Sequence, residues 1–265
     1  MISIVSKHAK RYWILILVAV FLIMLIAGYA MGFRPGPGLT VVRVGTLVVD
    51  GLPAGSTVYA DQSPRGTAGK NGSVSTGLVP GAHTVIVDIP NNEPWEKIVS
   101  IASNETTTVS PILVPKAPSA EHLNIAASIN EAATAIAHAA LPSESAPLQM
   151  GCATVFVSDN RVVVDAATTT PGCTPPEYLC TEGSCAPTIA YAPLATLRSV
   201  IPFPNRTDAV LVTAGEWVYA IALDPRNPRY FAPVHHGTAP SIAPASSTSP
   251  SFYMADKGGY YRFDF

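Results

Sequence analysis

The sequence predicts a mainly β protein that is preceded by one transmembrane helix. Residues 13–33 carry no charged side chain, and 25 Pro and 19 Gly residues divide the rest of the 265-residue chain into short segments. Many of these segments alternate apolar and polar residues, as half-buried strands do. Frequent Pro and Gly suit turns between strands and disfavour a helical bundle.

The first predicted element is the transmembrane helix over residues 13–33. A helix rises about 1.5 Å per residue, so this segment is long enough to cross a hydrocarbon core of about 30 Å. Three basic residues precede the segment, whereas only Arg34 follows it closely. The positive-inside rule therefore predicts that residues 1–12 form a cytoplasmic tail and that the bulk of the chain is extracytoplasmic.

A cleavable signal peptide is the alternative interpretation of the same segment. Signal peptides share the basic start and the apolar centre, and Gly28-Tyr29-Ala30 fits the small-x-small pattern of a cleavage site. The apolar segment exceeds the roughly 7–15 residues of a signal-peptide centre, so we favour an uncleaved anchor in a single-pass protein of the cell membrane. Both interpretations export the rest of the chain.

The charge of the exported part argues against nucleic-acid partners. Four of the 16 Lys and Arg residues, and none of the 18 Asp and Glu residues, lie at or before Arg34, so the remainder has a net charge of −6 (12 against 18). Nucleic acids and anionic membrane surfaces bind basic patches. Neither is expected as a partner of this part.

After a linker over residues 34–44, residues 45–115 are predicted to form a small antiparallel β-sandwich. The expected strands cover residues 45–51, 56–60, 83–89, 95–101 and 106–114, with a Gly-rich stretch after the second. The predicted core face consists either of Leu47, Val49, Val58, Val85, Val87, Trp95 and Val99 or of their immediate alternates along the strands.

This segment resembles the PEGA domain, a small β-sandwich of exported and membrane-tethered prokaryotic proteins. The resemblance rests on Gly51-Leu52-Pro53-Ala54-Gly55, Leu78-Val79-Pro80-Gly81-Ala82-His83, Pro94-Trp95 and Leu113-Val114-Pro115. Two letters of the name-giving tetrapeptide differ, because it falls on Pro53-Ala54-Gly55-Ser56. The resemblance implies a structural or adhesive module without a shared active site.

Residues 116–150 are predicted to form a linker that contains one alanine-rich helix. Ser119 is the expected N-cap, and Pro142 ends the pattern. The apolar face of the helix is predicted to consist of Ile125, Ile129, Ala132, Ile136 and Ala140.

Residues 151–265 are predicted to form a second β-rich domain. This part resembles the C-terminal, propeller-like repeats of uncharacterised bacterial membrane proteins, on the segments Asp208-Ala-Val-Leu-Val, Leu223-Asp-Pro-Arg226, His236-Gly237 and 253–262. Blades take about 40 residues each, so the segment holds at most three, fewer than a closed propeller needs. We expect an incomplete assembly whose open edges are covered by the helix, by disulfide-tied loops or by another chain, which makes self-association a hypothesis.

Four cysteines lie in this second domain, at positions 152, 173, 180 and 185. Outside the cytoplasm an even number indicates disulfides, and three pairings are possible. We favour Cys152–Cys173, which would span an expected β-hairpin at Asp159-Asn160, and Cys180–Cys185, which would close a hairpin-like loop. The alternative is a four-cysteine zinc site, but the paired Cys-x-x-Cys spacing that is typical of such sites is missing.

No catalytic, cofactor-binding or metal-binding motif is recognised. His235 and His236 are adjacent on an expected strand, so they would point to opposite faces rather than to one metal. Acidic residues at strand ends could assemble a carboxylate pair, but no spacing supports one: Asp159, Asp165, Asp208, Asp224 and Asp256. The candidate ligand contacts are Tyr253, Tyr260 and Tyr261, which would stack on a glycan.

The sequence thus predicts a membrane-anchored, non-catalytic binding or structural module of the cell envelope, with an envelope protein or a glycan as partner. Two alternatives stay open. One is an envelope hydrolase or carbohydrate-active protein with an unrecognised carboxylate site. The other is a subunit of a larger envelope assembly.

Overall fold

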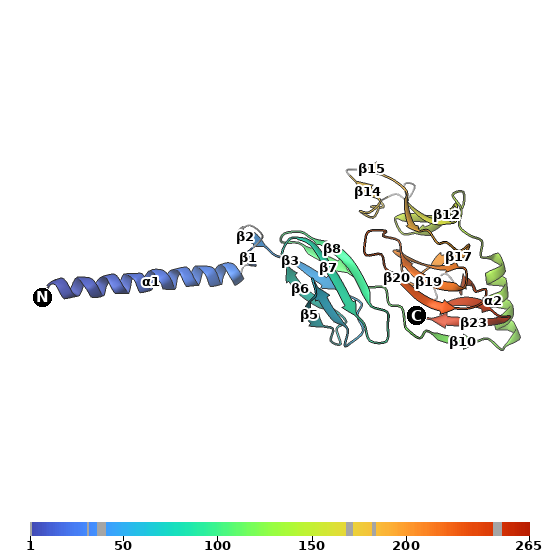
Figure 1. Ribbon diagram of the computed structural model, residues 1–265, viewed down its shortest axis with the longest axis horizontal. Helices are drawn as coiled ribbons and strands as arrows, with labels where there is room; N and C mark the ends of the chain where they lie inside the picture. Colours follow the sequence, from blue (N-terminus) through green and yellow to red (C-terminus); the bar gives the residue numbers. More distant parts are fainter. Residues whose placement is uncertain (1, 31, 36–40, 168–171, 182–183, 246–250) are drawn as a thin grey trace.

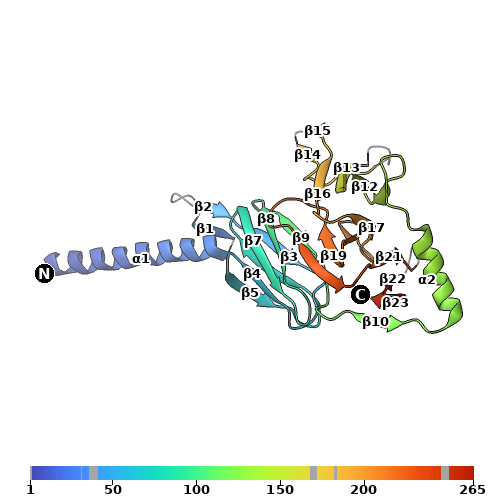
Figure 2. The same cartoon turned by 45° about the vertical axis from the view of Figure 1, so that its right-hand side comes forward.

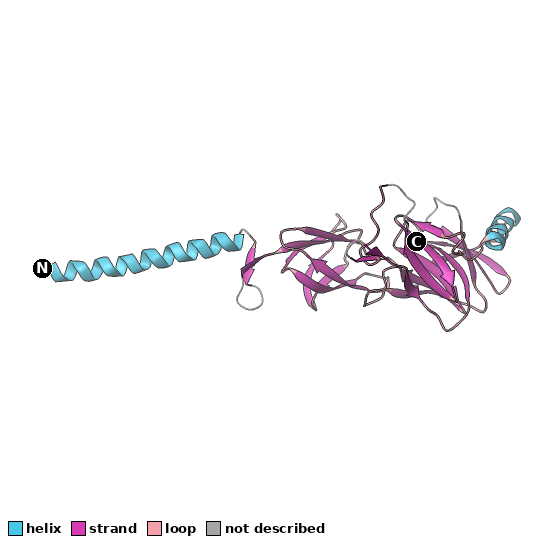
Figure 3. Cartoon of the chain, turned by 90° about the horizontal axis from the view of Figure 1, so that it is seen from above, coloured by secondary structure: helices cyan, strands magenta, loops and turns pink. Residues whose placement is uncertain are grey.

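The computed structural model is mainly β. Its described residues form two helices, which lie at opposite ends of the molecule (Figure 3). It describes residues 2–30, 32–35, 41–167, 172–181, 184–245 and 251–265. Part of the predicted linker, residues 36–40, lies outside the described residues.

The predicted anchor segment is helical up to residue 30. Helix α1 (Ile2–Ala30) extends away from all the strands except β1 (Phe33–Pro35) and β2 (Val41–Arg43), which form a small hairpin beside its end (Figure 1). Arg34 donates a 2.8 Å hydrogen bond to the carbonyl of Tyr29, and its guanidinium lies over the Tyr29 ring. In the described part of the chain, no helix meets the combined length and apolarity required of a membrane span.

The next seven strands form a sandwich of a three-stranded and a four-stranded sheet. The first sheet has the order β6-β3-β9 and the second the order β5-β4-β7-β8. The strands are β3 (Gly45–Val49), β4 (Thr57–Ala60), β5 (Ser63–Thr67), β6 (Val74–Leu78), β7 (Gly81–Asp88), β8 (Trp95–Ile101) and β9 (Thr106–Val109).

Two features of the sandwich differ from the sequence-based prediction. The expected Gly-rich stretch contains β5 and β6, and β9 pairs with β3 in parallel, with Leu47 opposite Thr107. A wholly antiparallel sandwich was therefore the wrong prediction, because β9 reaches β3 by crossing between the two sheets. Of the two predicted core faces, the first is confirmed, since all seven of its side chains are at most 6% exposed.

The chain after the sandwich does not form a simple linker. Residues 119–122 form β10 (Ser119–His122), which pairs antiparallel with the last strand, β23 (Gly259–Asp264). Helix α2 (Ala126–His138) starts after Ile125, which makes no side-chain capping hydrogen bond, so the predicted N-cap at Ser119 is wrong. The backbone of Ser119 is instead engaged in a sheet.

Apart from β14 (Cys180–Thr181) and β15 (Ser184–Cys185), which form a two-stranded sheet of their own, the remaining described strands and β10 form three four-stranded antiparallel sheets. The first has the order β11-β12-β13-β16, the second β17-β18-β19-β20, and the third β21-β22-β23-β10. Their strands are β11 (Leu148–Met150), β12 (Ala153–Ser158), β13 (Arg161–Ala166), β16 (Thr188–Tyr191), β17 (Leu197–Pro202), β18 (Ala209–Ala214), β19 (Trp217–Ala222), β20 (Phe231–His236), β21 (Ser241–Pro244) and β22 (Ser251–Asp256). Among the described strands, no sheet closes on itself.

Helix α2 lies against the third sheet (Figure 2). Ala132 is fully buried there, next to Leu123 and Tyr253. Half-buried Ile129 and Ile136 pack around the same cluster, so these parts of the predicted apolar face are confirmed. The prediction is wrong for Ile125 and Ala140, which are exposed and lie outside the helix. The short alanine side chains let the helix backbone approach the sheet closely.

Both hairpins that the sequence predicts are present, one within the first sheet and one as a separate two-stranded sheet. Asp159 and Asn160 both have positive φ in the two-residue turn between β12 and β13, the backbone that a type I′ turn requires. The second hairpin pairs β14 (Cys180–Thr181) with β15 (Ser184–Cys185). Disulfides join Cys152 to Cys173 and Cys180 to Cys185, the pairing that the sequence favours.

The apolar core continues from the sandwich into the C-terminal sheets. Ile112 and Val114, just after β9, are buried in the same cluster as Tyr230 and Ala232 next to and within β20. A separate cluster joins the first and second sheets through Val164, Val212 and their neighbours. The sandwich and the second and third sheets therefore share one core.

We predict that the two disulfides stabilise the protein unequally. They close loops with separations of 21 and 5 residues, and a longer loop loses more entropy in the unfolded chain when it is closed. Replacing Cys152 and Cys173 by Ala should therefore cost about 3 kcal/mol, and replacing Cys180 and Cys185 about 2 kcal/mol. Thermal unfolding of both double variants measures the order, and a reversed order would contradict the prediction.

Candidate functional site

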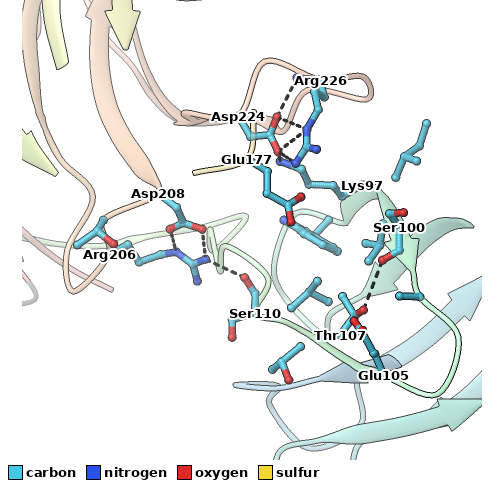
Figure 4. A pocket seen from close by; sticks show the side chains of 17 residues that line it. Lys97, Ser100, Glu105, Thr107, Ser110, Glu177, Arg206, Asp208, Asp224 and Arg226 are labelled. Atoms are coloured by element: carbon cyan, nitrogen blue, oxygen red, sulfur yellow. Dashed lines mark hydrogen bonds and ion pairs between the residues drawn. The ribbon is translucent and has the colours of Figure 1, made fainter. Parts of the chain in front are cut away.

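A cleft of about 730 Å³ lies between the sandwich and the C-terminal sheets (Figure 4). Strand β8 and the segment 105–110 line one side of this interdomain cleft. The other side is lined by Glu177, residues 206–208, Asp224 and Arg226. Charged groups of both signs therefore face the cleft.

Asp224 is the central charged group of the interdomain cleft. Its side chain is only about 10% exposed, and its Oδ2 atom lies 2.8 Å from Lys97 Nζ of the sandwich. Arg226 binds the same carboxylate through Nε and through Nη2, the latter at 2.7 Å. Burial by itself raises the pKa of Asp224, but the hydrogen bonds from Arg226 and Lys97 outweigh it and hold this pKa below its ordinary value.

Arg206 forms a second link across the same boundary. Its guanidinium binds Asp208 through two hydrogen bonds of 2.7 Å and donates to the carbonyls of Ser110 and Pro111 at 2.8 and 2.9 Å. These carbonyls belong to the segment that leaves β9. The guanidinium of Arg206 thus holds the end of the sandwich against the turn before β18.

A second concave surface, the aromatic groove, lies between the first and second C-terminal sheets and has a volume of about 530 Å³. We define it by residues 191–195, 214–217 and 219, with Phe231 beside it. The Trp217 and Tyr219 rings are nearly parallel, at 14°, with centroids 5.8 Å apart. Phe231 lies 4.2 Å from Tyr219 and 5.6 Å from Tyr191.

Polar groups border the aromatic groove. His236 Nε2 lies 3.5 Å from Glu216 Oε2, both side chains are more than half exposed, and the His236 ring is 4.4 Å from that of Trp217. Burial raises the pKa of both Tyr191 and Tyr219 above the ordinary value. Both phenols therefore keep their protons at neutral pH and can donate as well as accept hydrogen bonds.

The loop on one side of the groove is held by Asn160. Its Nδ2 donates to the carbonyls of Pro193 and Ala195, at 3.4 and 3.1 Å, and its Oδ1 accepts from the Leu197 amide at 2.8 Å. Leu194, at the tip of this loop, is fully exposed. The turn residue of the β12–β13 hairpin therefore shapes a wall of the groove.

The structure does not bring the three predicted ligand-contact tyrosines together. Tyr253 is 6% exposed and packs against α2, so its ring face is not open to solvent. Tyr260 is half-buried in the same cluster. Tyr261 packs against the larger core and contacts the His122 ring edge-on at 5.1 Å.

The two adjacent histidines point to different partners, as their strand position predicts. His235 Nε2 lies 3.4 Å from Asp256, whereas His236 faces Glu216. Asp256 also accepts hydrogen bonds from the backbone amides of Thr238 and Ala239, at 2.9 and 3.2 Å. Within the described residues, no group of three or more His, Cys, Asp or Glu side chains is placed to hold a metal ion.

The aromatic groove was not predicted from the sequence. Trp217 and Tyr219 lie two apart on a strand, with Val218 and Ala220 buried on the other face. The local sequence could therefore have indicated that these two rings share one face of the strand. The other two rings are those of Tyr191, on a strand that the sequence did not predict, and of Phe231 on β20. Only the packing of two sheets brings these rings together.

Residues 44–117 match the PEGA domain. This segment covers the sandwich and the residues that lead out of it. The match agrees with the resemblance noted from the turns of the sequence and concerns this part of the chain alone.

Two solved structures are similar over 83% of this chain, each at 11% sequence identity. One is a protein of unknown function from Bacteroides fragilis NCTC 9343, described as membrane-associated, with 93% of its chain covered and a TM-score of 0.22. The other is a DUF3823 family protein from Bacteroides ovatus ATCC 8483, with 96% covered and a TM-score of 0.21. Such low scores carry no argument about fold. No curated protein matches the chain.

We predict that Asp224 stabilises the boundary between the sandwich and the C-terminal sheets far more than Asp208 does. Asp224→Asn leaves Lys97 without its counter-charge at a largely buried position, which should cost about 3 kcal/mol. Asp208 is 59% exposed, so the matched Asp208→Asn variant should cost less than about 1 kcal/mol. Thermal unfolding of the two variants provides the comparison, and equal losses would contradict it.

The same carboxylate predicts acid sensitivity. A pKa that is lower in the folded than in the unfolded state gives stability that is present above the unfolded value, about 3.9, and is lost as the pH falls through the folded value. The melting temperature of the wild type should therefore fall more steeply than that of Asp224→Asn below about pH 4. Parallel curves for the two proteins would show that Asp224 does not contribute to the acid response.

Proposed function

We propose that this chain is a membrane-anchored, extracytoplasmic binding module of a cell envelope, without catalytic activity of its own. In this proposal, residues 13–33 anchor the chain and the PEGA-like sandwich is a rigid spacer. The three C-terminal sheets present the binding surface. The observation that carries the proposal is the core that the sandwich shares with the second and third C-terminal sheets, because it fixes the orientation of these sheets relative to the sandwich.

The charged links of the interdomain cleft support the role of the sandwich as a rigid spacer. The ion pair of Lys97 with Asp224 and the bonds of Arg206 to two backbone carbonyls both cross the boundary. A hinge would expose this boundary to water as it opened. Apolar burial and paired charges at the same boundary favour one arrangement.

The sequence of residues 13–33 and its flanks supports the membrane anchor. Described apolar side chains within it are widely exposed, with Trp13 at 67% and Ile26 at 68%. Aromatic and basic residues flank it, with Tyr12 and Trp13 at one end and Tyr29 and Arg34 at the other, as is typical near membrane interfaces. A helix that is apolar all round suits lipid better than water.

The pairing of two acidic residues in the interdomain cleft, Asp208 and Asp224, supports a non-catalytic role. Asp208 is bound by Arg206, and Asp224 by Lys97 and Arg226. A general acid needs a raised pKa, whereas the pKa of Asp224 is lowered. These carboxylates suit the role of structural links better than that of a proton donor.

We also propose that the three C-terminal sheets are blades of an incomplete propeller. Each has four antiparallel strands, and the first strand of each sheet contacts that of the next: β11 contacts β17, and β17 contacts β21. The third blade obtains its outer strand from β10, earlier in the chain. Self-association through the uncovered edges, or an envelope protein as partner, stays a prediction.

We predict that the full chain fractionates with membranes and exposes its C-terminus outside. After expression in a bacterium with a C-terminal epitope tag, the protein should remain in the pellet after carbonate washing. Protease added to spheroplasts should reach the tag. Leu17→Arg/Leu22→Arg should release the chain, because each arginine costs about 3 kcal/mol near the centre of a bilayer.

The matched control is Leu17→Ile/Leu22→Ile, which keeps both positions apolar and should remain in the membrane fraction. A wild-type chain that is extracted by carbonate, or a tag that is cut only after lysis, would contradict the proposed anchor and its orientation.

A further inference from the structure

We propose that the aromatic groove binds a saccharide chain, with Trp217 and Tyr219 as the stacking surface and Glu216 and His236 as hydrogen-bonding groups at its rim. This inference rests on the proposed function, because it names the class of ligand that the envelope module binds. The site lies on the opposite face of the second sheet from the core shared with the sandwich, since Val218 and Ala220 point into that core.

The rings are exposed where a core would bury them. Trp217, on the inner strand β19, is 38% exposed, and Phe231, on the edge strand β20, is 44% exposed. Fully exposed Leu194 borders the same surface. A contiguous exposed aromatic cluster with a polar border is typical of a binding surface.

The groove is formed before any ligand arrives. Its rings contact one another at centroid distances of 4.2 to 6.5 Å, and the pairing of β19 with β20 sets Trp217 opposite His236. Asn160 holds the opposite wall through three hydrogen bonds. A preformed site loses little entropy when it binds, so a weak class of contact such as ring stacking gives measurable affinity.

The combination of groups in the groove selects the class of ligand. The face of an aromatic ring is electron-rich and attracts polarised C–H groups, which a pyranose ring presents on its own face. The hydroxyl groups around a pyranose ring need partners at the edge of the stack. The Glu216 carboxylate can accept from them, and the His236 ring is placed beside it.

Other ligands use these groups less well. A lipid chain or an apolar helix would desolvate Glu216 and His236 without hydrogen-bonding to them, which costs free energy. An anionic ligand would be repelled by the Glu216 carboxylate. The volume of about 530 Å³ lies within the usual range of small-ligand sites and suits a short stretch of a saccharide chain.

The experiment uses the full chain in phosphatidylcholine nanodiscs, which avoid sugar-based detergents. Chitotetraose, cellotetraose and mannotetraose are titrated separately by calorimetry and by tryptophan fluorescence. Trp95 is 4% exposed and Trp13 belongs to α1, so a change in emission on binding reports on Trp217. We expect saturable binding of at least one of the three tetrasaccharides.

Three variants test the role of the ring and of the rim. Trp217→Leu keeps an apolar side chain but removes the ring, and it should weaken binding about tenfold. Trp217→Phe keeps a smaller ring and should stay within about threefold of the wild type. Glu216→Gln removes the charged acceptor and should weaken binding about threefold to tenfold. The control Ile98→Ala, at a 45% exposed apolar position on the sandwich, should bind as the wild type does.

Two results would overturn the inference. One is no saturable binding of any of the three tetrasaccharides. The other is binding that Trp217→Leu leaves unchanged while circular dichroism shows a folded protein. Neither result alters membrane fractionation, so failure of the saccharide assignment and failure of the proposed anchor are distinguishable.

Discussion

The carboxylate of Asp224 links the sandwich to the C-terminal sheets, and the arrangement of the rest of the structure depends on this link. Asp224 lies on the C-terminal side of the boundary. Its carboxylate forms ion pairs with Lys97 of the sandwich and with Arg226 of its own turn. One apolar cluster contains residues from both sides of this boundary, from Leu47 in β3 to Phe263 in β23. Because the boundary is filled on one side by apolar packing and fixed on the other by charge, the orientation of the C-terminal sheets follows from that of the sandwich.

Unpaired sheet edges are the second constraint on this fold, since exposed edges invite association with other chains. In the third sheet, β10 covers the edge of β23 by pairing with it, and α2 packs against β21, β22 and β23. The second sheet keeps β20 as an edge, and the pronounced aromatic character of this region, from Trp217 to Phe231, lies beside it. The edge that β10 protects therefore belongs to the third sheet, whereas the proposed ligand site belongs to the second.

The sequence predicted those parts of the fold whose partners are close in the chain. The hairpins at Asp159-Asn160 and at Cys180–Cys185, and the buried face from Leu47 to Val99, follow from alternation and turn chemistry alone. The strands it missed are short or pair with distant partners, as β10 does with β23. Helical spacing after Ser119 suggested a helix there, but tertiary pairing overrode this local preference. The aromatic groove was missed for the same reason, because Tyr191 and Trp217 meet only when two sheets pack.

The pairing of β10 with β23 has a consequence for the order of folding. Ser119 pairs with Asp264, so the two strands are separated by most of the C-terminal half of the chain. During synthesis, β10 emerges directly after the sandwich, whereas β23 emerges only after all the other described strands. Contacts of such long sequence separation form slowly, so the sandwich and the first two sheets can fold while the third stays incomplete. Until then β10 is an unpaired strand, to which a chaperone that recognises extended segments can bind.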